Sequence, residues 1–196
     1  MGNNTDNDEL VSRFWSKLNL VSDVITLMSG QPPVKETLLK VMKRIGEVQP
    51  FTSASIYFFD INEVVYKKEL SIGAEFDPSK YIKTNSSDRF SAWAAGIMKP
   101  IVLSNEGPDN HLSGSGIGSL VVVPLRIENR PIGLICLTHT EIGFFGKHDV
   151  ELFLMIAHQI GVSRERAIYQ KELEDRNEEL EKAQKMLELT QKRLIN

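Results

Sequence analysis

The chain of 196 residues contains a single cysteine, Cys136, which excludes an intrachain disulfide and any CxxC metal or redox motif. No apolar run approaches the roughly 18 to 20 residues that a helix needs to span a bilayer. The net charge is −3, so the cationic excess typical of a nucleic-acid-binding protein is missing. The polar start of the chain carries no signal-peptide pattern. These absences predict a cytoplasmic protein that binds neither nucleic acid nor membrane.

Motifs for catalysis and for metal binding are also missing from the sequence. The glycine-rich stretch at 113–119 (SGSGIGS) precedes a predicted strand, whereas a phosphate-binding loop precedes a helix. The four histidines show no HExxH or Cys–His spacing, and no nucleophile elbow or acid/base pair stands out. We therefore predict no catalytic residues and no metal ligands. A haem or metal sensor that uses His111 or His139 is kept as an alternative.

Hydrophobic periodicity divides the chain into an α+β domain flanked by two helices. Residues 1–8 are predicted to be disordered, an amphipathic helix is predicted over 9–29, and a second helix over 34–48. Alternating or continuous apolar runs then predict a sheet covered on both faces. The predicted strands are 53–60, 63–72, 101–103, 119–127 and 131–140. A helix over 86–98 is expected between the second and third strands, and a long helix is expected from about residue 146 onward.

The long helix carries leucines at positions 173, 180, 187 and 194, one every seven residues. This spacing predicts a parallel coiled coil over 163–196. Because neither glycine nor proline ends that helix, we expect the chain to be part of a longer protein, cut inside a dimerising connector. Two heptad frames are open. Leucines at d put four amides at a (Gln170, Asn177, Gln184, Gln191), and leucines at a put a mixed set at d (Tyr169, Arg176, Ala183, Thr190).

The central part of the chain resembles the GAF domain. The resemblance covers about residues 30–162 and rests on the order of several weak marks. They are a glycine that ends a helix, a serine and an apolar run ending in Pro-Leu, an Ile-Gly-x-x-x-Leu strand, and a phenylalanine and an acidic residue that open the last helix. In this sequence they are Gly96, Ser119, Pro124, Leu125, Ile132, Gly133, Leu137, Phe145 and Asp149.

The resemblance implies a six-stranded antiparallel sheet. One face would carry the terminal helices and the dimer interface, and the other a ligand pocket roofed by residues 86–116. Domains of this family bind cyclic nucleotides, bilins, haem, oxoacids or no known ligand, and they control attached output domains. Covalent bilin is disfavoured because no cysteine adjoins His111, and the methionine-sulfoxide reductase relatives are excluded by the cysteine count. His139 and Thr140 stand where cyclic-nucleotide-binding relatives often carry Asn-Lys.

The predicted ligand is a cyclic nucleotide, cAMP before cGMP. Arg89, at the start of the roof helix, would hold the phosphate, and an aromatic ring would stack on the base. Strand alternation places the candidate sheet residues on one face. The predicted ligand-binding residues are Ser55, Tyr57, Arg89, Phe90, Asn110, His111, Ser113, Ser115, Cys136 and Thr138.

The predicted function is thus a sensory domain from a larger bacterial signalling protein. It would act as a homodimer through its terminal helices and control a diguanylate cyclase or histidine kinase that lies outside this chain. The alternative is a module that only dimerises and transmits signals, with its pocket filled by its own side chains.

Overall fold

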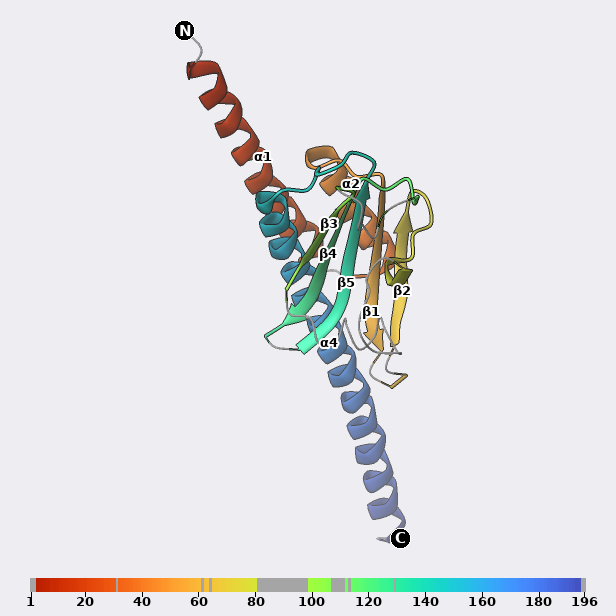
Figure 1. Cartoon of the computed structure of the whole chain (residues 1–196). Coiled ribbons are helices and arrows are strands. Elements are labelled where there is room, and N and C mark those ends of the chain that lie inside the picture. Colours follow the sequence, from red (N-terminus) through yellow and green to blue (C-terminus); the bar gives the residue numbers. More distant parts are fainter. Residues whose placement is uncertain are drawn as a thin grey trace.

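The computed structural model describes residues 3–30, 32–60, 62–63, 65–80, 99–106, 112, 114–128 and 130–194, with side chains described between residues 11 and 191 of these ranges. The elements follow the predicted order (Figure 1). They are α1 (Asn3–Met28), α2 (Lys35–Val48), β1 (Ser53–Asp60), β2 (Val65–Ile72), a 3₁₀ turn (Pro78–Lys80), β3 (Ile101–Ser104), β4 (Ser119–Ile127), β5 (Arg130–His139) and α4 (Lys147–Leu194).

The strands form one antiparallel sheet in the order β2-β1-β5-β4-β3. The described residues thus form five strands. The family resemblance implied six, and that expectation is corrected here. The sequence pattern itself contained five strands, and the sixth came only from the resemblance. The helix predicted over 86–98 lies outside the described residues.

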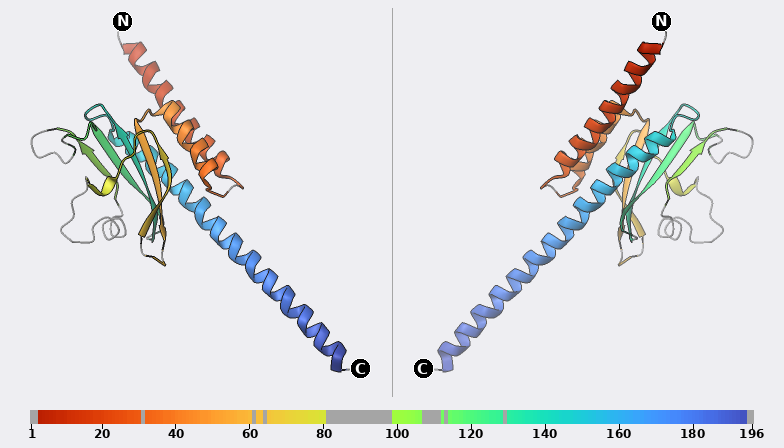
Figure 2. Two further views of the ribbon diagram at one scale, coloured as in Figure 1. Left: turned by 90° about the vertical axis from the view of Figure 1, so that its right-hand side faces the viewer. Right: turned by 90° about the vertical axis from the view of Figure 1, so that its left-hand side faces the viewer.

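The three helices of the described residues, α1, α2 and α4, lie on the same side of the sheet (Figure 2). This face exists because alternate residues of each strand are apolar, so that Ala54, Ile56 and Phe58 of β1 point toward the helices. The amphipathic helix α2 contributes Leu38 and Met42 at an i, i+4 spacing, both fully buried. The result is one hydrophobic core between the sheet and the helices.

The start of α4 is held by Asp149. Its carboxylate accepts the backbone N–H of Gly146 at 2.8 Å and the ammonium of Lys17 at 2.8 Å. The first contact satisfies one of the N–H groups that every helix leaves unpaired at its beginning. The second ties α1 to α4, so the acidic mark of the family has a structural role here.

Helix α1 differs from its prediction in two ways. It begins at Asn3, so residues 3–8, which we predicted to be disordered, are helical. Its buried face consists of Leu20, Val24 and Met28, whereas most of the predicted apolar stripe, including Phe14 and Trp15, is exposed. The stripe was correctly read as periodic, but periodicity does not say which of two apolar faces meets the domain.

Helix α4 runs without a break from the domain into the predicted coiled-coil segment and extends beyond the sheet (Figure 1). Where it leaves the domain, Arg166 donates to the carbonyl of Met28 at 2.9 Å, and Ser163 donates to the same oxygen at 3.4 Å. The end of α1 is therefore anchored to α4 at this point. No helix among the described residues is long and apolar enough to cross a membrane.

Candidate functional site

The sheet face opposite the helices brings together the predicted sheet residues. Ser53 pairs with Thr138, Ser55 with Cys136, and Tyr57 with Leu134 in the antiparallel register of β1 and β5. Cross-strand partners share a face, so the alternation predicted for both strands is confirmed. A second, smaller hydrophobic cluster covers the middle of this face, and its buried members are Tyr57, Phe76, Leu112, Leu120, Val122, Leu134 and Cys136.

Tyr57 belongs to this packed cluster. Its side chain is 6% exposed, and its hydroxyl donates to the carbonyl oxygen of Phe76 at 3.4 Å. Burial raises the pKa of the phenol well above its usual range. The ring of Tyr57 is thus already packed against protein, and it does not stand open to stack on a base.

A small polar pocket of about 150 Å³ lies at the end of this face, where β1 begins and β5 ends. Its walls come from both strands, from the segment after β2 and from the loop before β4. They include hydroxyl-bearing side chains and the apolar side chains of Phe76 and Ile117. The lining residues are Thr52, Ser53, Ala74, Glu75, Phe76, Ser115, Gly116, Ile117, Thr138, His139 and Thr140.

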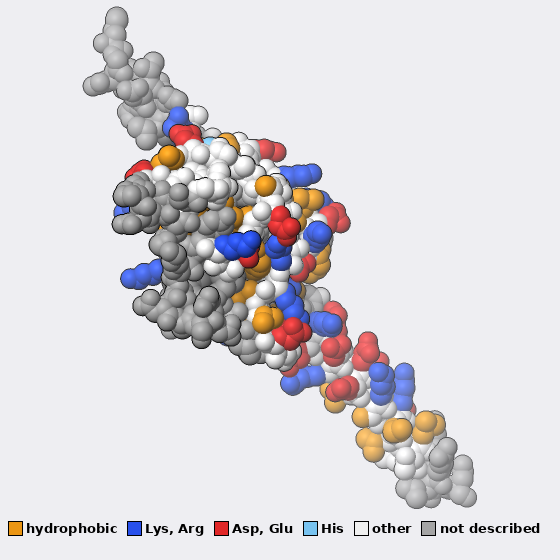
Figure 3. All heavy atoms as spheres, turned by 45° about the vertical axis from the view of Figure 1, so that its right-hand side comes forward, with side chains coloured by type: hydrophobic (Ala, Val, Ile, Leu, Met, Phe, Trp, Pro, Cys, Tyr) orange, Lys and Arg blue, Asp and Glu red, His pale blue; other side chains and the backbone are white. Residues whose placement is uncertain are grey.

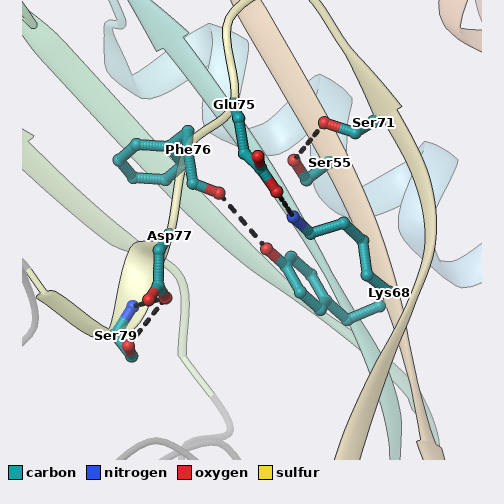
Figure 4. Close-up of polar contacts among 8 residues, drawn as sticks. Ser55, Lys68, Ser71, Glu75, Phe76, Asp77 and Ser79 are labelled. Atoms are coloured by element: carbon teal, nitrogen blue, oxygen red, sulfur yellow. Dashed lines mark hydrogen bonds and ion pairs between the residues drawn. The ribbon is translucent and has the colours of Figure 1, made fainter.

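A close backbone approach at Gly73 places one wall of this pocket. Gly73 has φ +79°, and a Cβ there would lie 2.3 Å from the carbonyl oxygen of Thr52, so only glycine fits. The chain then leads Glu75 and Phe76 over the sheet (Figure 4). Glu75 is held there by Lys68 of β2, at 3.1 Å between ammonium and carboxylate. Because both groups are on the surface, this pair orients the wall more than it stabilises the fold.

His139 adjoins the pocket at the end of β5, while its ring lies on the other sheet face, beside Phe144 and Phe145. Its Nδ1 accepts the backbone N–H of Glu141 at 3.1 Å, so the neutral ring carries its proton on Nε2. The ring stacks on Phe144, with centroids 3.5 Å apart and planes at 11°. Ser119 ties this segment down, because its hydroxyl donates to Glu141 O at 2.9 Å and accepts from Phe144 N at 2.8 Å. This segment is therefore held in place before any ligand arrives.

The sequence model of the GAF domain family matches residues 33–163, about two thirds of the chain. The chain belongs to the GAF domain family. The match agrees closely with the range of 30–162 expected from the sequence marks. No protein of curated function matches this GAF domain significantly in sequence.

Solved structures of other GAF domains share the fold. The GAF domain assigned to a sensor histidine kinase of Pseudomonas syringae pv. tomato superposes with a TM-score of 0.63 at 15% identity, over 87% of this chain and 99% of that one. The GAF domain of a phosphoenolpyruvate-protein phosphotransferase from Coxiella burnetii gives 0.60 at 13% identity, over 80% and 97%. Free methionine-R-sulfoxide reductase from Neisseria meningitidis gives 0.58 at 18% identity, over 76% and 88%. At these identities the likeness concerns the fold.

The ten predicted ligand-binding residues are distributed unevenly in this GAF domain. Ser115 and Thr138 line the pocket, while Ser55, Tyr57 and Cys136 lie on the same sheet face outside its lining. The hydroxyl of Ser115 donates to Leu112 O at 2.6 Å and accepts from Ile117 N at 3.1 Å, so it mainly shapes its own loop. Five predicted residues lie outside the described part of the chain: Arg89, Phe90, Asn110, His111 and Ser113.

Most lining residues were not among the predicted ligand-binding residues, and three of them show why. Ser53 follows from the same alternation as Ser55 and Tyr57, and extending that row by one step would have found it. Glu75 and Phe76 belong to no periodic segment. Their position depends on the close approach at Gly73, which sequence spacing does not reveal.

Cys136 provides a test of this packed face. Burial raises the pKa of its thiol above the range of an exposed cysteine. The folded protein therefore keeps this proton at a pH where the unfolded chain, with a thiol pKa of about 8.5, loses it. Below that pH the thiol is protonated in both states, and it does not make the stability depend on pH. Above it, we expect the free energy of unfolding to fall by up to ~1.4 kcal/mol per pH unit.

Urea unfolding at pH 7.5, 8.5 and 9.5 measures this dependence, and the Cys136→Ala control accounts for the ionisation of tyrosines in the unfolded chain, which begins near the upper end of this range. Burial raises the pKa of Tyr66 to about 12. In the Cys136→Ala control the free energy should be lower throughout but should lose this slope. Equal slopes in the two proteins would show that the thiol is not buried.

Proposed function

We propose that this GAF domain is a small-molecule-sensing regulatory module whose ligand binds in the polar pocket beside Thr138. The observation that carries the proposal is the preformed pocket, lined by hydroxyl-bearing and apolar residues, on the face opposite the helices. Pockets that combine an apolar base with a few placed polar groups are the usual form of small-molecule sites. No paired catalytic groups occur among the described lining residues, so we assign the pocket to binding.

The first ligand to test is a cyclic nucleotide, cAMP before cGMP. The hydroxyls of Ser53, Thr138 and Thr140 can donate and accept hydrogen bonds, as recognition of a ribose or a purine edge requires. Glu75 would accept from a ribose hydroxyl. No cation lines the described part of the pocket, so the phosphate would depend on the predicted contact with Arg89.

An aromatic chain connects the pocket with the output helix and supports a regulatory role. His139 at the end of β5 stacks on Phe144, whose ring lies 5.3 Å from that of Phe145. Phe145 in turn contacts Phe153 of α4 edge to face, at 5.9 Å between centroids. A ligand that shifts the end of β5 at His139 would push on these packed rings, and closely packed interiors transmit such displacements.

We further propose that α4 passes this signal to an output domain in a homodimer. A histidine kinase or a diguanylate cyclase is the proposed output, because both act as dimers whose activity can follow the phase or spacing of entering helices. The continuous helix from Lys147 to Leu194 supports this, since one rigid element joins the domain to the exposed leucine row.

Isothermal titration calorimetry with cAMP and cGMP tests the binding proposal. We expect binding in the sub-millimolar range, weakened about tenfold in Thr138→Val because a hydroxyl in the site is lost. Thr26→Val, on the exposed part of α1, is the matched control and should bind like the wild type. Undetectable binding of both nucleotides at 1 mM would contradict the cyclic-nucleotide assignment, and equal affinity in Thr138→Val would contradict the location.

One observation favours a ligand-free module as the second candidate. The pocket of about 150 Å³ is smaller than the roughly 300–1,000 Å³ of common ligand sites, and the packed cluster around Tyr57 fills the middle of the face. Under this alternative the domain only dimerises and transmits signals. The haem or metal alternative has no such support, since the described residues contain no group of three His, Cys, Asp or Glu side chains that could hold a metal.

A further inference from the structure

Exposed apolar side chains on α4 follow a heptad pattern that starts inside the domain. Met155, Val162 and Tyr169 are spaced by seven and are 48%, 39% and 55% exposed. Leu173 follows Tyr169 after four residues, and Leu180 and Leu187 continue that second row. A step of four separates the two core positions of a heptad, and the leucine positions inside the domain are occupied by Arg166 and Gln159. The row on the domain and the leucine row therefore belong to one heptad frame.

The competing frame is blocked by the domain. It places Asn177 and Gln170 in the core with the leucines, and the same row continues upstream to Ser163 and Ile156. Both of these are only 1% exposed. Ile156 lies in the core against the sheet, and the Ser163 hydroxyl donates to Met28 O. A seam in this frame would have to change register where α4 leaves the domain.

We propose that the homodimer inferred above closes along this stripe in one heptad frame, with the leucines at a and with Met155, Val162, Tyr169, Arg176 and Ala183 at d. The inference rests on the proposed role as a dimeric signalling module and names the surface that builds the dimer. A two-fold axis along α4 places each core position beside its own counterpart, so one heptad row is complementary to itself. The apolar side chains gathered on the far part of α4 are visible in Figure 3.

Helix α1 widens the same surface within the domain. It runs parallel to α4, as shown by the contacts of Lys17 with Asp149 and of Met28 O with Arg166 (Figure 2). Between the two helices, the exposed Phe14 and Leu18 line an apolar groove of about 470 Å³ together with Leu152 and Met155. The dimer is therefore a four-helix bundle at the domain that narrows to two helices beyond Met28.

The charges beside the seam are compatible with a parallel pair. In this frame, Glu172 and Glu179 occupy g positions and face the e positions of the second copy. Those positions carry amides, Asn177 and Gln184, so each carboxylate meets a hydrogen-bond donor and no like charge. These contacts do not repel the second copy, but they add little to the stability of the dimer.

Arg176 makes the seam weak at a defined place. It occupies a d position between Leu173 and Leu180, and its guanidinium pairs with Glu172 of the same helix at 3.0 Å. A charged core position specifies register at a cost in stability. We therefore expect the coiled coil to be weakest just beyond the domain, where a signal from the pocket would arrive.

Disulfide cross-linking of variants with one added cysteine tests the heptad frame. Ala183→Cys is in the core of the proposed frame and outside it in the rival one, whereas Gln184→Cys is the reverse. The native Cys136 is buried and does not interfere. We expect Ala183→Cys to form the interchain disulfide at least about fivefold faster under mild oxidation, because core positions of a parallel pair lie closest together. Faster linking of Gln184→Cys would overturn the assignment.

Analytical ultracentrifugation provides an independent measure. Arg176→Leu should tighten the dimer at least about tenfold, while the neighbouring Asn177→Leu should change it by less than about twofold. Val162→Glu should weaken the dimer at least about tenfold, because it buries a charge in the seam. Ile168→Glu, at a more exposed position off the seam, should not. The opposite ranking in either pair would refute the proposed frame.

The failure of this inference can be told apart from a failure of the proposed ligand binding. A wild-type chain that remains monomeric up to about 100 µM would overturn the seam, whatever the calorimetry shows. Absence of nucleotide binding together with the expected cross-linking would overturn the ligand assignment and leave the seam in place.

Discussion

Gly133→Ala is expected to destabilise the domain by at least about 3 kcal/mol, enough to leave much of the protein unfolded at 25 °C. Gly133 lies in the central strand β5, between Phe58 of β1 and Leu125 of β4. A Cβ built on it would lie 2.4 Å from the Tyr57 carbonyl oxygen and 2.7 Å from the Leu125 side chain. Because neighbouring strands confine this backbone on both sides, it cannot move away without breaking ladder hydrogen bonds.

Gly46→Ala is the matched control. This glycine is in helix α2, and a Cβ there makes only an ordinary contact, 3.4 Å from the Phe51 ring. Alanine should therefore stabilise the helix by about 0.5–1 kcal/mol. Circular dichroism and urea unfolding of both variants decide the matter. A Gly133→Ala protein as stable as the wild type would show that the strands do not approach as closely as described.

Phe153→Ala is expected to lower the free energy of unfolding by about 3–5 kcal/mol. Phe153 is 1% exposed, and it is the largest of the fully buried side chains among the described residues. Its ring closes the aromatic chain with Phe145 and packs α4 onto the sheet. Truncation removes these contacts and leaves a cavity that rigid strands cannot refill. Thermal unfolding followed by circular dichroism measures the loss.

Two further substitutions sharpen this result. Phe153→Leu keeps most of the volume and should recover more than half of the stability. Ile168→Ala lies on the same helix but is exposed, so we expect a change within about 0.5 kcal/mol. If Phe153→Ala and Ile168→Ala had similar stabilities, the packing of α4 on the sheet would be contradicted.

Much of the fold was predictable because its elements carry strong local patterns. Strands β1, β4 and β5 alternate or run continuously apolar, and they begin and end within one residue of the prediction. Gly133 is one of the family marks, and the close approach of the Tyr57 carbonyl oxygen at that position gives its structural reason. Two other family marks also have structural roles. Ser119 holds the loop before α4, and Asp149 holds the start of α4. A short-range pattern suffices wherever one element decides its own conformation.

The pocket was harder to predict because its wall arises from contacts between distant segments. Thr138 was identified through strand alternation, which is local. Glu75 reaches the pocket through the turn at Gly73 and the ion pair with Lys68, and neither follows from spacing. Tyr57 was correctly placed on the face, but its burial against Phe76 and Leu112 depends on how other segments fold over it.

The sequence by itself determined the family, the order of helices and strands, and the seven-residue leucine row of α4. Those features depend on residues close together in the chain, whose periodicity matches helix or strand geometry. Only the tertiary structure decided which apolar face of α1 is buried and which heptad frame stays open. Leu20 and Val24 meet the core while Phe14 and Leu18 remain exposed, and Ile156 is covered while Met155 is not. Periodicity places residues on a face, but which face another element covers depends on three-dimensional packing.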